Sequence, residues 1–289
     1  MGFENVTIGK ATFEQDLKLK PAGGILTVNS IHELIQAVGT LKHAAEPYER
    51  IYFRGQKKLH SGLRPVAYRG IENASEQNDR HRLIAGVLKK FQEQHPKTFS
   101  SINKKAHEPL LQHYGISTTW IDLVDNIWIA LWFSLFEAYP FNNGRYVHFE
   151  PRRDADDEFG YILLIAVDET RRVKPVKGFL LGSNTETVDL RIAAPADFLR
   201  PHSQHGLLFR PKKNQKPDQG GFSRALDYLD HVRGILKYKT SNAYRWLGQG
   251  EAHSVRSLFP PPFHDHGYMT LLEADLGDDI IGRVHHVGA

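Results

Sequence analysis

The chain of 289 residues contains no cysteine, which excludes disulfide bonds, thiolate metal ligands and cysteine nucleophiles together. Long apolar runs are also absent. The longest, residues 127–136, falls well short of the roughly 20 residues that a membrane-spanning helix requires. The chain opens without a charged and then apolar leader, and Val6 stands where a myristoylation signal requires serine or threonine. We therefore expect a cytoplasmic protein that makes no membrane contact.

Several catalytic signatures are missing too. The sequence has neither the Gly-x-x-x-x-Gly-Lys-Ser/Thr loop nor the Gly-x-Gly-x-x-Gly turn that bind nucleotide phosphates, and it lacks the Gly-x-Ser-x-Gly turn of serine hydrolases. Its histidines do not form the His-Glu-x-x-His zinc pattern, so no metal site is expected. The segment His264-Asp265-His266 keeps one alternative open, as the centre of a nuclease or as an ordinary surface loop.

The charge balance is mildly basic. There are 37 basic and 33 acidic side chains, a net charge of +4, which is compatible with an anionic ligand. The basic residues occur as scattered pairs such as Lys57-Lys58, whereas an arm that binds nucleic acid would concentrate them in one block. With 40% hydrophobic and 24% charged residues, the composition is typical of a globular enzyme or binding protein.

Hydrophobic periodicity and turn residues predict the order of the elements. Ser30 and Glu33 have the spacing of a helix capping box, and apolar residues then recur at helical spacing up to Leu41. Short β-branched and aromatic runs predict strands. The expected helices are 31–41, 78–93, 106–115, 127–139 and 223–239. The expected strands are 50–55, 116–121, 145–149, 160–167, 188–192 and 207–210, and a last helix or strand is expected at 268–274.

The arrangement of these elements suggests a fold class and a division of the chain. Helices come first and strands cluster later, an order that fits an α+β fold better than a doubly wound parallel sheet. We expect a core at residues 25–210, preceded by an N-terminal arm at residues 1–24. A C-terminal extension of helices and loops at residues 211–289 would pack on this core. Loops are expected at 154–158, which is acidic, and at 211–221.

Three segments resemble the FRG domain, a bacterial and phage family named for a tripeptide that stands here as Phe53-Arg54-Gly55. The second segment, residues 111–118, reads Leu-Gln-His-Tyr-Gly-Ile-Ser-Thr and is followed by Asp122 and by Ala-Leu-Trp-Phe at residues 130–133. The third is Gln204-His205-Gly206 before an apolar run. The resemblance covers about residues 50–210. This chain departs from the family at three places. Ser117 stands where the family often has Pro, Thr119 where it often has Arg, and Leu123-Val124 where it often has Trp-Thr.

The order of these motifs resembles the plan of ADP-ribosyltransferases, in which a strand-end arginine, a Ser/Thr element and a Gln- or Glu-bearing strand surround NAD. Arg54, Ser117-Thr118 and Gln204 stand in those three places. The resemblance implies a mixed, mainly antiparallel sheet like that of the ADP-ribosyltransferase fold, with surrounding helices. It also implies that NAD or a related nucleotide binds, with release of nicotinamide and transfer of ADP-ribose to a macromolecule or to water.

The resemblance further implies roles for individual residues. A guanidinium pairs with pyrophosphate oxygens through a planar fork of donors, an imidazole acts as acid or base near neutral pH, and an aromatic ring stacks on nicotinamide. Two kinds of role stay open for Asp122. The structural one, which we favour, is a cap or an ion pair with Arg54, and the functional one is a general base or an orienter of His113. The expected catalytic residues are Arg54, Ser117, Thr118, Gln204 and His205, and the expected cofactor-binding residues are Phe53, Arg54, Gly55, His113, Tyr114 and Gly115.

One catalytic group of that plan is missing. Many such enzymes carry Gln-x-Glu, whose glutamate stabilises an oxocarbenium-like transition state, and Gly206 takes its place here. Loss of this carboxylate costs several kcal/mol, on the order of a thousandfold in rate. Another carboxylate such as Glu251 or Glu273 would have to replace it, or the site binds without turnover. The alternative function is therefore a non-catalytic sensor that binds a nucleotide or nucleic acid in phage–host conflict. The sequence does not predict an oligomeric state.

Overall fold

A computed structural model describes residues 3, 7–15, 24–152, 159–170, 176–212, 226–248, 250–277 and 281–288 of the chain. In the described residues the fold is α+β, as the element order predicts, with a mixed and mostly antiparallel sheet. The loop predicted at 154–158 and most of the one predicted at 211–221 lie outside these residues. No helix in the described parts is long and apolar enough to cross a membrane.

The main sheet has nine strands in the order β1-β2-β11-β7-β3-β4-β10-β9-β8, and β2 and β11 form its one parallel pair among the described residues. A second sheet has the order β12-β6-β5. The strands are β1 (Thr12–Glu14), β2 (Ile25–Thr27), β3 (Glu49–Gln56), β4 (Ile121–Val124), β5 (Phe136–Phe141), β6 (Tyr146–Pro151), β7 (Phe159–Asp168), β8 (Phe179–Leu181), β9 (Thr185–Asp189), β10 (Gly206–Pro211), β11 (Val232–Lys239) and β12 (His286–Gly288).

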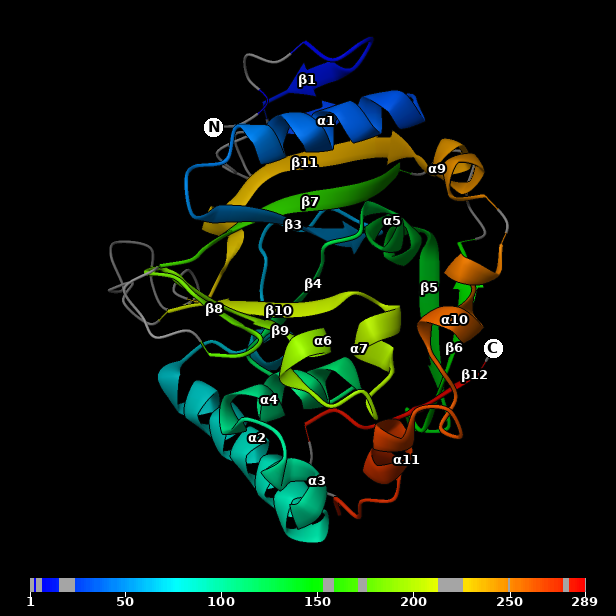
Figure 1. The fold of residues 1–289 in the computed structure, drawn as a ribbon. Coiled ribbons are helices and arrows are strands. Elements are labelled where there is room, and N and C mark those ends of the chain that lie inside the picture. The colour runs from blue at the N-terminus through cyan, green and yellow to red at the C-terminus, as the bar shows by residue number, and fades with distance from the viewer. Residues whose placement is uncertain are drawn as a thin grey trace.

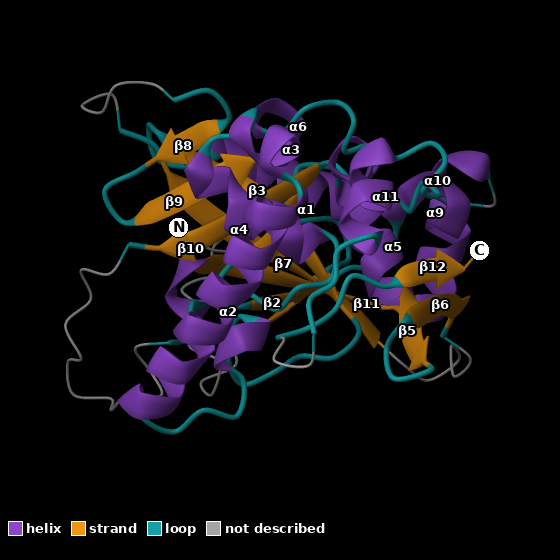
Figure 2. Ribbon diagram, turned by 90° about the horizontal axis from the view of Figure 1, so that it is seen from below, coloured by secondary structure: helices purple, strands orange, loops and turns teal. Residues whose placement is uncertain are grey.

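Helices cover both faces of the main sheet. Helix α1 lies along β11, β7 and β3 at the top of Figure 1, whereas α2, α3 and α4 lie beyond β10 at the bottom. Figure 2, seen from below, places β5, β6 and β12 together at one side of the molecule. The helices are α1 (Ile31–His43), α2 (Ala74–Gln94), α3 (Pro96–Ser100), α4 (Lys104–His113), α5 (Ile127–Leu135), α6 (Leu190–Ala193), α7 (Arg200–Ser203), α9 (Thr240–Leu247), α10 (Val255–Leu258) and α11 (His266–Leu272), with 3-10 turns at Val66–Tyr68, Leu229–His231 and Glu251–His253.

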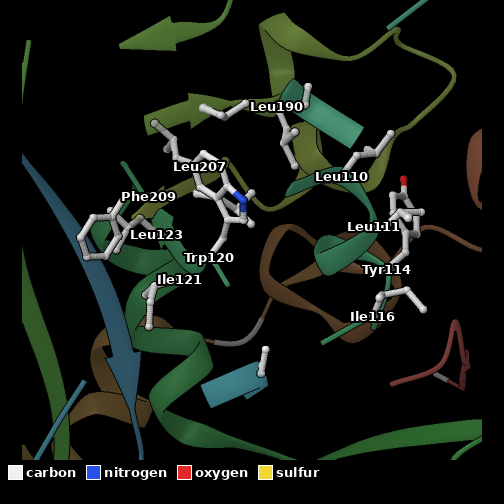
Figure 3. Close-up of a cluster of buried hydrophobic side chains, with 14 of the residues drawn as sticks. Leu110, Leu111, Tyr114, Ile116, Trp120, Ile121, Leu123, Leu190, Leu207 and Phe209 are labelled. Atoms are coloured by element: carbon white, nitrogen blue, oxygen red, sulfur yellow. The ribbon is translucent and has the colours of Figure 1, made fainter. Parts of the chain in front are cut away.

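Two hydrophobic cores lie on opposite faces of the sheet. In β7, Ile162, Leu164 and Ala166 belong to one core, and the alternate residues Leu163 and Ile165 belong to the other. A strand buried on both faces is apolar at every position, which explains the continuous run in the sequence. Figure 3 shows part of the second core, where residues of α4 and β10 pack around Trp120.

The predicted start of the first helix is confirmed. Ser30 Oγ accepts a hydrogen bond from the backbone N–H of Glu33 at 3.2 Å, so Ser30 is the N-cap of α1. The Glu33 carboxylate accepts from the backbone N–H groups of Asn29 at 2.7 Å and Lys10 at 2.9 Å instead of returning to Ser30. This glutamate therefore ties residues near the N-terminus to the first helix.

The predicted helix at 223–239 is wrong where the structure describes it, because residues 232–239 form β11 between β2 and β7. Its apolar residues fill both faces of the sheet, and pairing with distant strands overrides the local pattern. The helix predicted at 127–139 ends at Leu135, and Phe136 begins β5, which pairs with β6. Pairing of residues 136–141 with β6, rather than a local signal, sets this earlier end.

Two further boundaries differ from the prediction. The strand expected at 116–121 is found at Ile121–Val124, and the one expected at 188–192 ends at Asp189, where α6 begins. In both regions a short β-branched run continues into a turn, and sheet pairing rather than composition sets the boundary. Four of the predicted strands, at 50–55, 145–149, 160–167 and 207–210, are confirmed as β3, β6, β7 and β10.

Candidate functional site

The main sheet divides between its two central strands. Strands β3 and β4, both fully described, are paired only at Phe53 and Val124. Figure 1 shows β3 grouped with β7 and β11, and β10 grouped with β9 and β8, with β4 between the two groups. A cavity of about 290 Å³ lies where β3 and β4 separate. It is lined by Phe53, Arg54, Gly55, Gln112, His113, Gly115, Asp122, Leu123, Val124, Phe133, Phe149, Arg200, Gln204, Phe259 and His285.

The cavity joins residues that are far apart in the sequence. Arg54 comes from β3, His113 from the end of α4, Asp122 from β4 and Gln204 from the residue after α7. Each of the three family-like motifs therefore contributes to the same hollow, which we call the Arg54 pocket. The sequence-predicted residues that line it are Phe53, Arg54, Gly55, His113, Gly115 and Gln204.

Arg54 is only partly engaged by the protein. Its Nη1 donates to the backbone carbonyl of Asp122 at 2.8 Å, and the same nitrogen lies 3.8 Å from a carboxylate oxygen of Asp122. Its Nε is buried without a hydrogen-bond partner. Burial lowers the pKa of Arg54, and the Asp122 charge counteracts this shift. An arginine with an unused donor at a cavity wall is suited to an anionic guest.

Asp122 stands at the centre of a network that explains its ionisation. Burial alone would raise the pKa of Asp122, but the nearby imidazole of His113, the charge of Arg54 and a hydrogen bond from Gln112 lower it below its ordinary value. Gln112 Nε2 donates to the Asp122 carboxylate at 2.9 Å, and the buried Thr118 hydroxyl donates to Gln112 Oε1. Thr118 thus acts on the pocket indirectly, through the orientation of Gln112.

The absence of a side chain at Gly206 has a steric cause. A Cβ atom there would lie 2.5 Å from Cε1 and 2.7 Å from Nε2 of the His113 ring. His113 is nearly buried, with 5% of its side chain exposed, and its Nδ1 lies 3.9 Å from Asp122. The imidazole therefore fills the space in which a glutamate at position 206 would begin.

Gly55 and Gly115 both line the pocket and both permit close approach of another segment. A Cβ atom on Gly55 would collide with the backbone carbonyl of Ala130, so this glycine allows α5 to pack directly against β3. Gly115 has φ +112°, and a Cβ atom there would lie 2.7 Å from Nδ1 of His285. A positive φ at this position agrees with the predicted helix end.

The side chains of Gln204 and His205 lie in different environments, one in the pocket wall and one outside it. Gln204 is buried, lines the pocket and donates through Nε2 to the carbonyl of Leu258 at 2.8 Å. His205, at φ +50°, directs Nδ1 to the Asp125 carboxylate at 2.8 Å and is not part of the pocket lining. Arg191 also binds Asp125, at 2.8 Å.

Two other expected site residues lie outside the lining. Tyr114 is fully buried, donates to Asp265 at 2.7 Å and packs beside Leu111 and Ile116, as Figure 3 shows. The backbone N–H of Ser117 donates to Ile281 at 2.9 Å, in a contact with the C-terminal segment. The Ser-Thr element is therefore split between a structural contact at Ser117 and the Gln112 network at Thr118.

Several lining residues had no distinct signal in the sequence. The apolar lining includes Phe149 and Phe259, which lie outside the family-like motifs and whose rings stack with centroids 4.4 Å apart. Arg200 is 1% exposed, yet nothing in its sequence neighbourhood marks it as more than a surface arginine. Only the packing of distant segments places these groups together.

The histidine-rich C-terminal region does not gather around a metal. Among the described residues, no group of three or more histidine or acidic side chains has a geometry that could hold an ion. Asp265 is fully buried and accepts hydrogen bonds from the Tyr114 hydroxyl, at 2.7 Å, and from the backbone N–H groups of Arg200, at 3.0 Å, and Tyr268, at 2.8 Å. This carboxylate is the N-cap of α11 and is engaged in the core.

Fold and pocket together define an α+β protein with a charged cavity where its sheet divides. A family model described as the FRG domain matches residues 49–143, roughly a third of the chain. The predicted resemblance to FRG domains is thus confirmed over these residues, which include the first two motifs. No curated protein and no solved structure matches the chain. The likeness to the ADP-ribosyltransferase fold remains a prediction.

Proposed function

We propose that the Arg54 pocket binds NAD or a related nucleotide and that Asp122 supplies the carboxylate for cleavage of its glycosidic bond. The observation that carries this proposal is the meeting of Arg54, His113, Asp122 and Gln204 in one cavity. These residues come from three motifs whose order resembles that of ADP-ribosyltransferases. Nicotinamide would be released, and ADP-ribose would pass to water or to a macromolecular acceptor.

The partial freedom of Arg54 supports the binding of a phosphate-bearing guest. If Asp122 held the guanidinium in a close bidentate pair, no anion would gain access to it. Instead the carboxylate contact is long, at 3.8 Å, 21% of the Arg54 side chain is exposed, and Nε has no partner. A phosphate or ribose oxygen of the nucleotide would use the unengaged side of this guanidinium.

The aromatic wall supports a planar ring as the other part of the guest. Phe133, Phe149 and Phe259 line the pocket together with Phe53, and an aromatic face pairs well with a nicotinamide or a base. This wall takes the role that the sequence had suggested for Tyr114. A cavity of about 290 Å³ is at the lower end of the roughly 300–1,000 Å³ typical of ligand pockets. It would enclose one half of a dinucleotide, with the other half outside.

Asp122 is the candidate for the missing catalytic carboxylate. Its lowered pKa keeps it ionised at neutral pH, and it shares the pocket wall with Arg54. Cleavage of the nicotinamide glycosidic bond develops positive charge on the ribose, which a fixed carboxylate stabilises. The steric contact between position 206 and His113 explains why this carboxylate would come from β4 instead of from the Gln-x-Glu position.

A second candidate is a sensor that binds the nucleotide without cleaving it. The observation in its favour is that the Asp122 carboxylate already accepts a hydrogen bond from Gln112 at 2.9 Å. A carboxylate held in this way is less available to a sugar. Steep salt dependence of RNA or DNA binding would instead favour a nucleic-acid ligand.

Incubation of the purified protein with NAD tests the proposal, with nicotinamide release and NAD affinity measured side by side. We expect Arg54→Ala to lose both. Asp122→Asn should retain binding but lower the release rate by several hundredfold to a thousandfold, because only the charge is removed. Arg50→Ala, which removes an exposed arginine from the same strand, is the matched control. Binding without release by the wild type favours the sensor, and no binding at all rejects both candidates.

A further inference from the structure

Arg200 is a buried cation that the proposed cleavage does not use. Only 1% of the residue is exposed, and the residue lines the Arg54 pocket. Its Nη1 donates to the backbone carbonyl of His113 at 3.2 Å, whereas Nε and Nη2 have no hydrogen-bond partner. Buried polar groups are nearly always paired, so an arginine with two idle nitrogens at a cavity wall indicates a missing partner.

The protein surrounds this guanidinium with aromatic rings. Its central carbon lies 4.4 Å from the ring centroid of Tyr268, 4.5 Å from that of Tyr114 and 5.3 Å from that of Phe259. These rings fix the plane of the guanidinium and favour its positive charge. The Tyr268 side chain also hydrogen-bonds Arg200, and Nε and Nη2 are the two guanidinium nitrogens left without a partner.

No described carboxylate neutralises Arg200 by direct contact. The Asp265 carboxylate accepts from the backbone N–H of Arg200, the Tyr114 hydroxyl and the backbone N–H of Tyr268, and not from the Arg200 guanidinium. The pocket as a whole contains two guanidiniums, Arg54 and Arg200, and one carboxylate, Asp122. Burial and the charge of Arg200 lower the pKa of His285, which also lines the pocket and is neutral at pH 7. The lining therefore carries a net positive charge.

We propose that Arg200 is the phosphate-binding residue of the pocket and that the nucleotide is held there through a phosphate group beside its planar ring. The fork of donors on Arg200 matches phosphate oxygens, and Arg54 faces the same cavity with its own unpaired Nε. The apolar wall of Phe149 and Phe259 then receives the ring. This inference rests on the proposed function for the location of the site, and it adds which part of the ligand the site selects.

The wild-type protein gives the first test, because it avoids any change in folding. Nicotinamide mononucleotide and nicotinamide riboside differ by one phosphate, and their dissociation constants are measured by calorimetry. We expect the mononucleotide to bind roughly ten- to a hundredfold more tightly, as charge-assisted hydrogen bonds to one phosphate would give. Equal affinity for the two compounds would overturn the proposal.

Variants then assign the effect to Arg200. We expect inorganic pyrophosphate to raise the Tm of the wild type and of the control Arg50→Met, whose arginine is exposed on β3. Arg200→Met should abolish this rise, and Arg200→Lys should restore part of it because a single ammonium replaces the fork. If Arg200→Met is folded and still gains stability from pyrophosphate, the assignment is wrong. If Arg200→Met does not fold, the lysine variant and the two wild-type affinities decide.

Pyrophosphate also separates this inference from the proposed function. Stabilisation by pyrophosphate through Arg200 without NAD binding would retain the phosphate site and reject the dinucleotide. NAD cleavage that is unaffected by Arg200→Lys, together with equal binding of mononucleotide and riboside, would retain the reaction and reject the phosphate role of Arg200.

Discussion

Gly206 and His113 illustrate how a single position limits the chemistry of this pocket. The imidazole ring occupies the space that a side chain at position 206 would need. The same ring lines the pocket together with Asp122. A glutamate could be introduced there only if His113 moved away from the cavity. Packing between α4 and β10 thus leaves no room for a side chain at this position.

Replacement of Gly206 by alanine should destabilise the protein. The new methyl group would lie 2.5 Å from Cε1 of the His113 ring, and overpacking of this kind costs about 1–3 kcal/mol. Thermal melting should show a Tm lower by about 2–4 °C per kcal/mol. Gly86→Ala is the matched control, because nothing lies within 4 Å of a Cβ on this exposed residue of α2. That control should gain about 0.5–1 kcal/mol from helix propensity. An unchanged Tm for Gly206→Ala would mean that His113 rearranges freely.

The turn between β8 and β9 depends on one carboxylate from β7, a strand that pairs with β11 and β3 in the sheet. Asp168, at the end of β7, accepts hydrogen bonds from the backbone N–H groups of Ser183 at 2.6 Å, Asn184 at 2.9 Å and Thr185 at 2.8 Å. Burial would raise the pKa of Asp168, but the Thr185 hydroxyl and these N–H groups lower it overall. The edge of the sheet is thus fixed from its centre.

Asp168→Ala should destabilise the chain by about 2 kcal/mol, because it leaves the N–H groups of this turn without their charged acceptor. Asp168→Asn keeps one acceptor oxygen and should lose less. Urea unfolding of both variants measures the difference, and hydrogen exchange at residues 183–185 should accelerate in the alanine variant first. Equal stability of wild type and Asp168→Ala would show that solvent replaces the carboxylate at no cost.

Buried histidines link the stability of the entire chain to pH. Burial lowers the pKa of His231, and the charge of Arg233 adds to this effect. Burial followed by the charge of Arg200 lowers the pKa of His285 in the same way. Both rings are neutral in the folded protein and would take up a proton more readily once unfolded, at a pKa of about 6.5.

We therefore expect the Tm to be constant from about pH 8 to 7 and to fall as the pH drops below about 6.5, because the unfolded chain then binds more protons. A second fall is expected below about pH 4, where Asp122, Asp125 and Asp168 lose the stabilisation that their lowered pKa values represent. Thermal melts across this range test both steps. His231→Gln should flatten the first step and leave the second unchanged. A Tm that rises between pH 6.5 and 5 would contradict this account.

Elements with strong local signals were predictable from the amino-acid sequence. The Ser30 cap and its apolar stripe gave the first helix, and the apolar run ending at Val167 gave the central strand β7. Of the motif around Gly115, His113 and Gly115 line the Arg54 pocket and Tyr114 does not. Predictions were wrong where one hydrophobic pattern fits two kinds of element. At residues 232–239 an apolar run suits either a helix or a strand buried on both faces.

The sequence determined the local elements and the types of side chain available, because caps, turns and hydrophobic periodicity act over a few neighbouring residues. Tertiary structure alone decided that Arg54, Asp122 and Gln204 share a cavity and that Tyr114 does not line it. It also turned Arg200 from one basic residue among 37 into a buried cation with two unpartnered nitrogens. Burial and ionic pairing depend on residues that are distant in the sequence, and no local pattern encodes such contacts. Arg54 and Asp122, for example, are 68 positions apart.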